Sequence, residues 1–454
     1  MNEFKTPGVY IVERSVLPES VSGVSTAIPA FIGYTEKAGV DKELFYKPTR
    51  VTSLNNYVEQ FGAPTETINV EAKDDELTLK ITEPKKLMYY GMQMFFANGG
   101  ESCYIVALDE NNDDPTVTEL QKYMMAVDAL ELEDEPTLIV LVDGVNMENA
   151  DDYYSACQYV LSHCNKIKNR FAIFDVIETN NSTDTDILAF RGGIGNQHLQ
   201  YSAAYYPYLK TVLRYRYSDD SVNVTYLDGD IEYNHPLGHE EIKIKRTALY
   251  NEITKVIANQ TVTLPPATAV AGLYAGVDRE RGVWKAPANV SLISVVGPTR
   301  KLSEEENDRM NVDEGSGKSI NAIRSFTGKG TLVWGARTLA GNSNEWRYVP
   351  VRRLFNYVEE SIQKATSYAV FEPNTAMTWL KLKTTVESFL ESLWRQGGLA
   401  GDRAEDAYFV QVGLGTTMTS QDIAEGRLII RVGMAAVRPA EFIIIEFTHK
   451  LQQS

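Results

Sequence analysis

Three short apolar runs alternate with stretches of helical periodicity in the first half of the chain, and this alternation constrains the fold most. The runs are CYIVAL (103–108), TLIVLVD (137–143) and RFAIFDV (170–176). The segments between them, Leu120–Leu130 and Tyr153–Cys164, read as helices. Repeated strand–helix–strand units form a parallel sheet that is covered by helices on both faces. The sequence therefore predicts an α/β fold.

Two polar segments interrupt this pattern and are predicted to be hairpin insertions. The first lies at 62–86 and contains the alternating run ELTLKIT. The second lies at about 215–242, where Asp228-Gly229 is a favourable turn between two alternating runs. Both are expected to project from the α/β part of the chain.

The length of 454 residues exceeds what one compact core usually holds, so more than one structural unit is expected. A polar run after Pro298, TRKLSEEENDRMNVDEGSGKS, suits a boundary. We therefore expect an extended N-terminal arm over 1–20, an α/β domain over 21–300 and a C-terminal domain over 301–454. The C-terminal domain is expected to end in a second extended arm from about residue 437. With an α/β domain followed by a separate domain of helices and a sheet, the fold is expected to be α+β overall.

The C-terminal part carries two amphipathic helices followed by three strands. One helix places Leu354, Val358 and Ile362 on a common face, and the other does so with the apolar residues between Val386 and Leu393. The strands are AYFVQVG, RLIIRVG and EFIIIEF. This pattern predicts a small sheet packed on two helices.

Both ends of the chain carry apolar strands that have no obvious partner nearby, VYIVE at 9–13 and FIIIEF close to the C-terminus. Unpaired strand edges promote aggregation unless something covers them. The strands either pair within the molecule or add to sheets of neighbouring copies, which links molecules through main-chain hydrogen bonds. The predicted inter-subunit arm residues are Val9, Tyr10, Ile11, Val12, Phe442, Ile443, Ile444, Ile445 and Phe447.

Charge is spread unevenly over a chain whose formal net charge is −17. The segment 101–152 contains fifteen acidic residues and one basic residue, Lys122, whereas 321–365 contains seven basic and three acidic residues. Such segregation suits stacking of copies or contact with unlike partners, although a solvated acidic surface is an equally simple interpretation. The acidic balance argues against nucleic-acid binding.

The segment GSGKS at 315–319 resembles the end of a phosphate-binding loop and raises the alternative of a nucleotide-driven secretion component. A phosphate loop needs a first glycine where this chain has Val312, and it follows a buried strand. The polar run SEEENDRMN precedes it here instead. We therefore expect a glycine-rich turn in which Lys318 is a mobile surface lysine.

No other pattern predicts an active site, a metal or a cofactor. His235 and His239 are close in sequence, but Pro236 and Gly238 exclude a zinc-binding helix, which leaves a loop site or ordinary polar residues. The three cysteines are expected to be reduced and mostly buried, as in a cytosolic chain. No apolar run approaches the roughly 20 residues that span a bilayer, and the first residues lack the pattern of a secretory signal.

Several long segments resemble contractile tail sheath proteins of phages and phage-like injection machines. They occur in the same order as in that family: TPGVYIVE, SGVSTAIPAFIG, GLYAGVDRERGVWKAPAN, INAIRSFTGKGTLVWGARTL, EWRYVPVRRLFNYVEESI, AVFEPN, LWRQGGLAG and IRVGMAAVRPAEFIII. The resemblance covers both ends and most of the C-terminal half. It weakens across the two insertions, and the α/β middle matches only in pattern.

The resemblance implies a non-enzymatic structural subunit without cofactors. Sheath subunits polymerise helically, expected as stacked six-fold rings, around an inner tube, and their terminal arms complete a sheet in adjacent subunits. Contraction from a metastable extended state drives the tube through a target membrane. The implied partners are the tube, baseplate and cap proteins, with paralogous sheath subunits left open, and neither nucleic acid nor direct membrane insertion is implied.

The resemblance also places the chain in the cytoplasm during synthesis and assembly. The finished phage tail or injection particle is then either released or anchored in the producing cell. Candidate tube- or neighbour-facing polar residues are Arg352, Arg353, Arg395 and Arg403. A surface-layer or adhesin module is a third interpretation, disfavoured because the sequence starts without a secretory signal.

Overall fold

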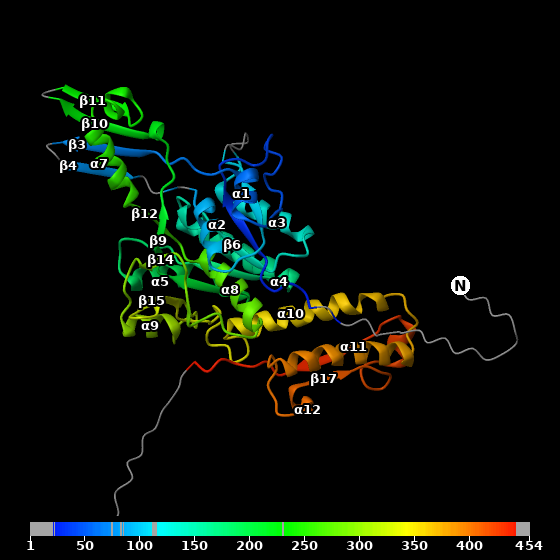
Figure 1. The fold of residues 1–454 in the computed structure, drawn as a ribbon. Helices are drawn as coiled ribbons and strands as arrows, with labels where there is room; N and C mark the ends of the chain where they lie inside the picture. The colour runs from blue at the N-terminus through cyan, green and yellow to red at the C-terminus, as the bar shows by residue number, and fades with distance from the viewer. Residues whose placement is uncertain are drawn as a thin grey trace, which may run out of the picture. The chain divides into compact units, whose positions relative to one another are not determined.

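The computed structural model describes residue 21 and residues 23–73, 76–81, 84, 86–110, 116–228 and 231–441. The chain divides into two compact units (Figure 1). The large unit comprises Ser25–Tyr357 with Arg438–Ser454, and the small unit comprises Met1–Val24 with Val358–Val437. The boundary lies inside helix α10 (Val349–Thr366) and not at residue 300, because residues 301–357 contribute strands to the main sheet.

The large unit is built on a nine-stranded sheet in the order β13-β16-β15-β8-β7-β6-β1-β5-β2. The strands are β1 (Pro29–Tyr34), β2 (Thr49–Val51), β5 (Cys103–Leu108), β6 (Leu138–Leu141), β7 (Phe171–Asp175), β8 (Ser202–Tyr206), β13 (Val290–Ser291), β15 (Asn321–Phe326) and β16 (Gly330–Val333). The six from β15 to β5 are parallel, and the strands at both edges are antiparallel. The predicted parallel sheet is therefore confirmed.

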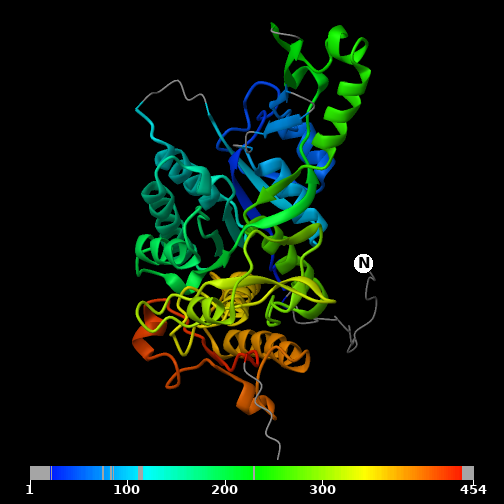
Figure 2. The same cartoon turned by 90° about the vertical axis from the view of Figure 1, so that its left-hand side faces the viewer.

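Helices cover both faces of this sheet, as the alternating pattern predicts. On one side α3 (Glu119–Ala129) packs against α4 (Ala150–Ile167) and α4 against α5 (Thr183–Gly193); on the other α2 (Met88–Ala97) packs against α8 (Ala267–Arg281) (Figure 2). Gly272 allows the last two helices to approach closely, because a Cβ at this position would lie only 2.4 Å from the carbonyl oxygen of Phe95. The remaining helices of this unit are α1 (Leu54–Phe61), α6 (Glu240–Lys243), α7 (Thr247–Ala258) and α9 (Glu304–Asn311), with short 3-10 turns η1 (Leu130–Leu132), η2 (Gly144–Asn146), η3 (Leu199–Tyr201) and η4 (Asp219–Ser221).

Two buried aspartates at the carboxyl ends of adjacent strands hold the starts of the α2 and α8 helices. Asp143, after β6, accepts hydrogen bonds from the amides of Leu87 (2.6 Å) and Tyr34 (2.7 Å). Asp175, which ends β7, accepts one from the amide of Ala267 (2.8 Å). Burial raises the pKa of Asp143 to about 7 and that of Asp175 to about 8. Their role here is helix capping.

The two predicted insertions are confirmed as hairpins and form one sheet together, in the order β11-β10-β3-β4. The first supplies β3 (Ile68–Lys73) and β4 (Glu76–Ile81), and the second supplies β10 (Val222–Asp228) and β11 (Ile231–Pro236). The hairpins join through a parallel pairing between β10 and β3, and Val70 and Val224 are buried along it. A further antiparallel sheet has the order β12-β9-β14, from β9 (Leu209–Arg214), β12 (Thr261–Leu264) and β14 (Val295–Pro298).

The small unit contains the second half of α10 and the long helix α11 (Ala376–Arg395). It also contains η5 (Ser367–Ala369), α12 (Ala404–Ala407), α13 (Ser420–Ala424) and an antiparallel pair of strands, β17 (Tyr408–Gln411) and β18 (Arg431–Met434). Its interior is formed by Leu382, Val386, Leu390 and Leu393 of α11 with Val410 of β17. Both predicted helices are confirmed, as is the strand predicted at AYFVQVG, whereas the strand predicted at RLIIRVG begins only at Arg431. The third predicted strand, EFIIIEF, lies outside the described residues except for its first residue, Glu441.

Candidate assembly interface

The two-stranded sheet of the small unit has an open edge on each side within the described part of the chain. β17 and β18 pair from Tyr408 with Met434 to Gln411 with Arg431. No described strand pairs with the outer side of either one. A pair of strands is marginally stable alone, and its outer backbone groups can accept further strands. This sheet is therefore a ready acceptor for added strands.

The predicted arm residues lie outside the described part of the chain. They are Val9, Tyr10, Ile11, Val12, Phe442, Ile443, Ile444, Ile445 and Phe447. Their pairing with neighbouring copies stays a prediction.

An exposed apolar patch, which no sequence pattern indicated, lies where α10 leads into α11. Phe371 is fully exposed at 102%, with Val370, Met377 and Leu380 also exposed. Phe371 has a φ of +70°, which a bulky side chain rarely adopts. The loop is held by Asn374, which donates to the Arg427 carbonyl oxygen (3.0 Å) and accepts from the Trp379 indole (2.6 Å). The segment AVFEPN carried this signal, but its letters do not reveal which side chain points outward.

Arg352 and Arg353 are buried within the large unit, at 4% and 3% exposure, so their predicted role at a partner-facing surface is corrected. The Arg352 guanidinium lies 4.1 Å from the centre of the Trp346 ring. Arg353 pairs with Asp278 and donates to the Thr26 carbonyl oxygen (2.9 Å). Desolvating an arginine is tolerated when such partners satisfy it.

Arg395 and Arg403 are exposed, as a contact with a partner requires, but each is bound to an acidic neighbour in sequence. Arg395 pairs with Glu391 at 2.5 Å, and Arg403 pairs with Asp406 at 3.1 Å. Exposed pairs of this kind contribute little stability and exchange readily. Their contact with a tube or a neighbour stays a prediction.

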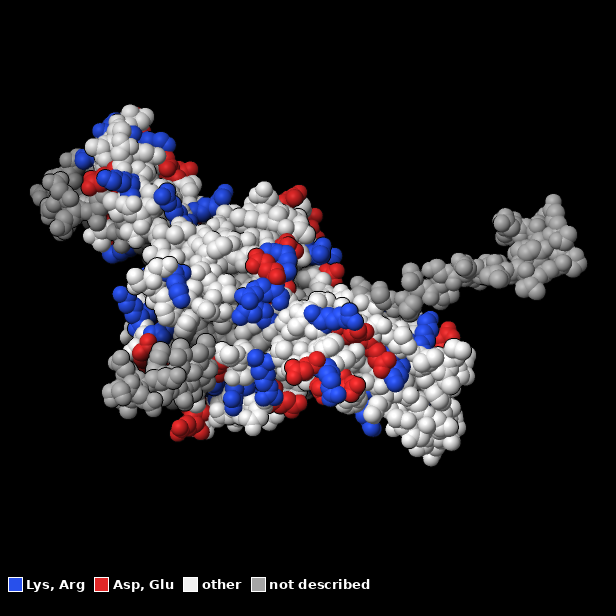
Figure 3. All heavy atoms as spheres, turned by 60° about the horizontal axis from the view of Figure 1, so that its bottom comes forward, with Lys and Arg blue, Asp and Glu red and all other residues white. Residues whose placement is uncertain are grey.

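The positive charge of 321–365 is largely neutralised inside the subunit. Arg324 pairs with Glu304, and Lys364 pairs with Glu360. Arg337 pairs with Glu441. Figure 3 shows basic and acidic side chains interspersed over the face that it presents. The basic residues that are close in sequence thus do not form one broad positive surface there.

Lys318 of the GSGKS segment is buried at 4% exposure, which corrects the prediction of a mobile surface lysine. Its ammonium donates to the Arg191 carbonyl oxygen in the last turn of α5, and the Arg191 Nε donates back to the Lys318 carbonyl oxygen (2.9 Å). Burial lowers the pKa of Lys318. The segment follows a helix and precedes β15, the reverse of a phosphate loop. The predicted glycine-rich turn is confirmed, and its lysine holds the C-terminal end of α5 through this hydrogen bond.

A groove of about 620 Å³ lies between α5 and α9. Its charged side chains pair with one another, Arg309 with Asp184 and Arg191 with Asp313. Ile187, Leu188 and Val312 supply its apolar part. No arrangement of nucleophile, base and oxyanion donor is present among these described residues.

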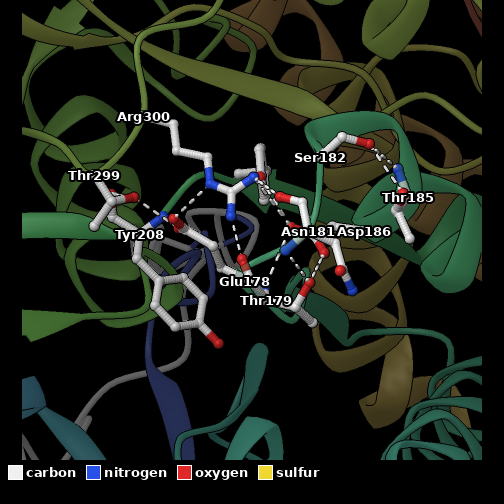
Figure 4. Close-up of polar contacts among 10 residues, drawn as sticks. Glu178, Thr179, Asn181, Ser182, Thr185, Asp186, Tyr208, Thr299 and Arg300 are labelled. Atoms are coloured by element: carbon white, nitrogen blue, oxygen red, sulfur yellow. Dashed lines mark hydrogen bonds and ion pairs between the residues drawn. The ribbon is translucent and has the colours of Figure 1, made fainter.

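A second polar cluster gathers around Arg300 and fixes the loop that follows β7 (Figure 4). The Arg300 guanidinium contacts Glu178 (3.1 Å) and the carbonyl oxygens of Thr179 and Asn181. Glu178 also accepts hydrogen bonds from the Tyr208 amide and the Thr299 hydroxyl. These contacts tie three segments of the large unit together, so the cluster stabilises the fold.

The histidines and cysteines form no metal site among the described residues. The rings of His235 and His239 stack in parallel with centroids 4.2 Å apart, and the Nδ1 of His239 accepts from the Glu241 amide (3.3 Å). Cys103, Cys157 and Cys164 are free and buried, as predicted, and burial raises their thiol pKa values. No helix in the described ranges is long and apolar enough to cross a membrane.

Glu441 is a further candidate residue that no sequence motif indicated. It is the last residue of the described part of the chain, and its carboxylate binds Arg337, Asn311 and Tyr348 in the large unit. Partial burial acts to raise its pKa, but hydrogen bonds from Arg337 and Asn311 outweigh this and hold the pKa below the ordinary value. In the sequence, the one indication of such a role is that this glutamate directly precedes the apolar run FIII.

The chain is similar to known sheath proteins, over part of its length in sequence comparisons and over nearly all of it in comparisons with solved structures. Residues 342–450 match the model of the phage tail sheath C-terminal domain. The tail sheath protein of Enterobacteria phage T4 is 24% identical over 186 residues, which are 40% of this chain and 25% of the phage protein. The putative prophage major tail sheath protein of Pseudomonas aeruginosa is 26% identical over 181 residues, or 44% of its length. The chain therefore aligns with less than half of the length of these relatives.

Solved structures match over nearly the full length. The sheath of the extracellular contractile injection system PVC, in its contracted state, is 32% identical, covers 99% of both chains and has a TM-score of 0.68. The contracted helical sheath of the anti-feeding prophage is 30% identical, with 99% of this chain and 100% of that chain covered and a TM-score of 0.68. The similarity thus includes both units of the fold.

Proposed function

This chain belongs to the family of contractile tail sheath proteins, and on that premise we propose that it polymerises helically around an inner tube and contracts to drive the tube through a target membrane. The observation that carries the proposal is the match at 32% identity over 99% of both chains with the sheath subunit of an injection system. We assign it a structural role without a cofactor. Baseplate and cap proteins are its expected further partners.

The assembly step of this proposal rests on strand addition between copies. The sheet of β17 and β18 offers open edges, and the chain carries apolar segments at 9–13 and 442–447 that suit added strands. Strand addition supplies main-chain hydrogen bonds for affinity and side-chain alternation for specificity. Each copy would donate strands to one neighbour and accept strands from another, and such heterologous contacts generate an open helix.

The contraction step needs links that survive a large movement. Main-chain pairing through the arms would keep neighbours connected while the large units rotate as rigid bodies. The driving free energy would come from a metastable extended polymer, whose subunits form better contacts in the contracted one. The firm internal ties of the large unit, through Arg300 and Lys318, support movement as a rigid body.

Truncation of either end tests the assembly step. We expect variants lacking residues 1–12 or 442–454 to keep the melting temperature of the full chain, since the two described cores remain intact. They should nevertheless fail to form tubes in negative-stain electron microscopy. The intact chain at the same concentration is the control and should form hollow helical tubes. Normal tubes from either truncated variant would refute the arm model.

A further inference from the structure

Glu441 forms a preorganised clamp with the large unit at the point where the C-terminal segment begins. Arg337 donates to both carboxylate oxygens, Nε to Oε1 at 2.8 Å and Nη2 to Oε2 at 2.7 Å. Asn311 donates its side-chain amide to Oε1 (2.7 Å), and the Tyr348 hydroxyl donates to Oε2 (3.0 Å). The carboxylate thus accepts four hydrogen bonds from three different segments of the large unit.

The donor side of the clamp is also held by contacts that do not involve Glu441. Arg337 has a side-chain exposure of 5%, and its Nη1 also donates to the Asn311 carbonyl oxygen (3.1 Å). Its backbone is held by Asn321 at the start of β15, which accepts from the Arg337 amide and donates to the Arg337 carbonyl oxygen, both at 2.8 Å. The guanidinium is therefore aimed by the main sheet.

The energetics of this pair differ from those of the exposed pairs on the small unit. A two-point arginine–carboxylate contact is strong and restricts direction as well as distance. Glu441 is the ion-pair partner of Arg337 among the described residues, so its removal would leave a buried guanidinium without a countercharge. The clamp is thus expected to stay closed while exposed pairs exchange.

We propose that the Glu441–Arg337 clamp positions the C-terminal arm, by fixing the point and the register at which residues 442–454 leave the subunit. This inference rests on the proposed function, in which that arm adds a strand to a neighbour. Glu441 directly precedes the apolar run Phe442-Ile443-Ile444-Ile445. A slip of one residue turns every side chain of a strand to the opposite face. An anchor one residue before the run therefore sets which side chains face the acceptor sheet.

A simpler role for Glu441 is to neutralise Arg337 and stabilise the large unit without any effect on the arm. The two roles differ in what an insertion does. One alanine inserted between Glu441 and Phe442 leaves every contact of the clamp in place but shifts the arm by one residue. A neutralising role predicts no effect of that insertion, whereas a positioning role predicts impaired assembly.

The experiment uses the full-length chain with Glu441→Gln, with the single-alanine insertion, with both changes together, and with residues 442–454 deleted. The matched control is Glu304→Gln, which removes a carboxylate from a pair with Arg324 in which the glutamate is 80% exposed. Thermal melts report folding of the monomer, and sedimentation with electron microscopy gives the critical concentration for tube formation.

We expect the insertion and Glu441→Gln each to raise the critical concentration at least about tenfold, with the insertion leaving the melt unchanged. The insertion should add nothing in the Glu441→Gln background, because the anchor is already lost. Assembly of the insertion variant at the concentration of the Glu304→Gln control would overturn the positioning role, even if Glu441→Gln destabilised the monomer. Normal assembly of the deletion variant would refute the arm model itself, whereas a blocked deletion with an unaffected insertion would refute the anchor alone.

Discussion

Buried charged residues in this chain serve as helix caps and loop anchors, and the Lys318–Arg191 pair shows how. Each side chain donates to the other's backbone carbonyl oxygen, which joins the end of α5 to the segment before β15. Sequence alone favoured an exposed lysine, because unpaired lysines are rarely buried. The partner carbonyl lies 127 residues away in sequence, and no local pattern reveals such a contact.

Replacement of Lys318 by methionine should lower the free energy of unfolding of the large unit. The Arg191 carbonyl oxygen would lose its buried donor, which costs about 1–3 kcal/mol. Urea denaturation of the variant and of the original chain measures this difference. ATP turnover that is present in the original chain and absent from the variant would contradict the structural role and restore the nucleotide alternative.

The raised pKa of Asp175, about 8, makes stability depend on pH in a defined direction. The folded state binds this proton more tightly than the unfolded state, whose aspartate has a pKa of about 4. Stability is therefore expected to fall as pH rises between these two values. Asp175→Asn keeps an oxygen to accept from the Ala267 amide and removes the charge.

We expect the stability advantage of Asp175→Asn over the original chain to increase between pH 5 and pH 8, by on the order of 1 kcal/mol or more. Urea titrations at both pH values test this. Asp184→Asn is the control for the loss of a carboxylate, because that side chain is half-exposed and paired with Arg309. An equal pH slope for Asp175→Asn and the original chain would contradict the prediction.

At the scale of single elements, strands and helices with a strong local period were predictable and long-range pairing was not. The runs at β5, β6 and β7 are almost entirely apolar, which only a sheet buried on both faces explains. Both hairpins were likewise visible from alternation. Their union into one sheet was not, because the parallel pairing of Val222 with Ile68 joins residues more than 150 positions apart.

The same limit applies to the candidate interface. The apolar stripe of α11 follows from its 3.6-residue period, so its buried face was predictable. The exposure of Phe371 depends on a positive φ and on the contacts of Asn374 with Arg427, and neither leaves a periodic signal. Backbone strain of this kind is retained mainly where function requires the conformation.

Phe371→Gly should impair assembly while sparing the fold. Glycine adopts a φ of +70° without strain, and the exposed ring makes no contribution to a core, so the monomer should be at least as stable. Aromatic residues often anchor interfaces, so we expect a critical concentration for tubes raised several-fold. The control is Val40→Ser, a residue that is 91% exposed in the large unit. Equal critical concentrations for both variants would show that the patch makes no contact in the polymer.

At the scale of the whole molecule, the chain passes between its two compact units at three places, after residues 24, 357 and 437. The continuous core of the large unit contains the main sheet and its helices and extends to Val349. The interior of the small unit, around Leu390, is not part of that core. Sequence length indicated more than one unit, and the polar run after Pro298 predicted a boundary at residue 300. That boundary was too early, because β15 and β16 follow the polar run and belong to the main sheet.

Separate cores predict two unfolding transitions in the monomer, because each core can lose its packing while the other keeps its own. Leu390→Ala opens a cavity in the small unit, and Leu138→Ala opens one in the β6 strand of the large unit; both leucines are fully buried. Each change should cost about 2–5 kcal/mol and shift only the transition of its own unit in differential scanning calorimetry. A single transition that both variants shift equally would mean that the two units unfold as one. In that case the sheath could not use the small unit as a separately folded connector, because any force on the β17–β18 sheet would unfold the large unit as well.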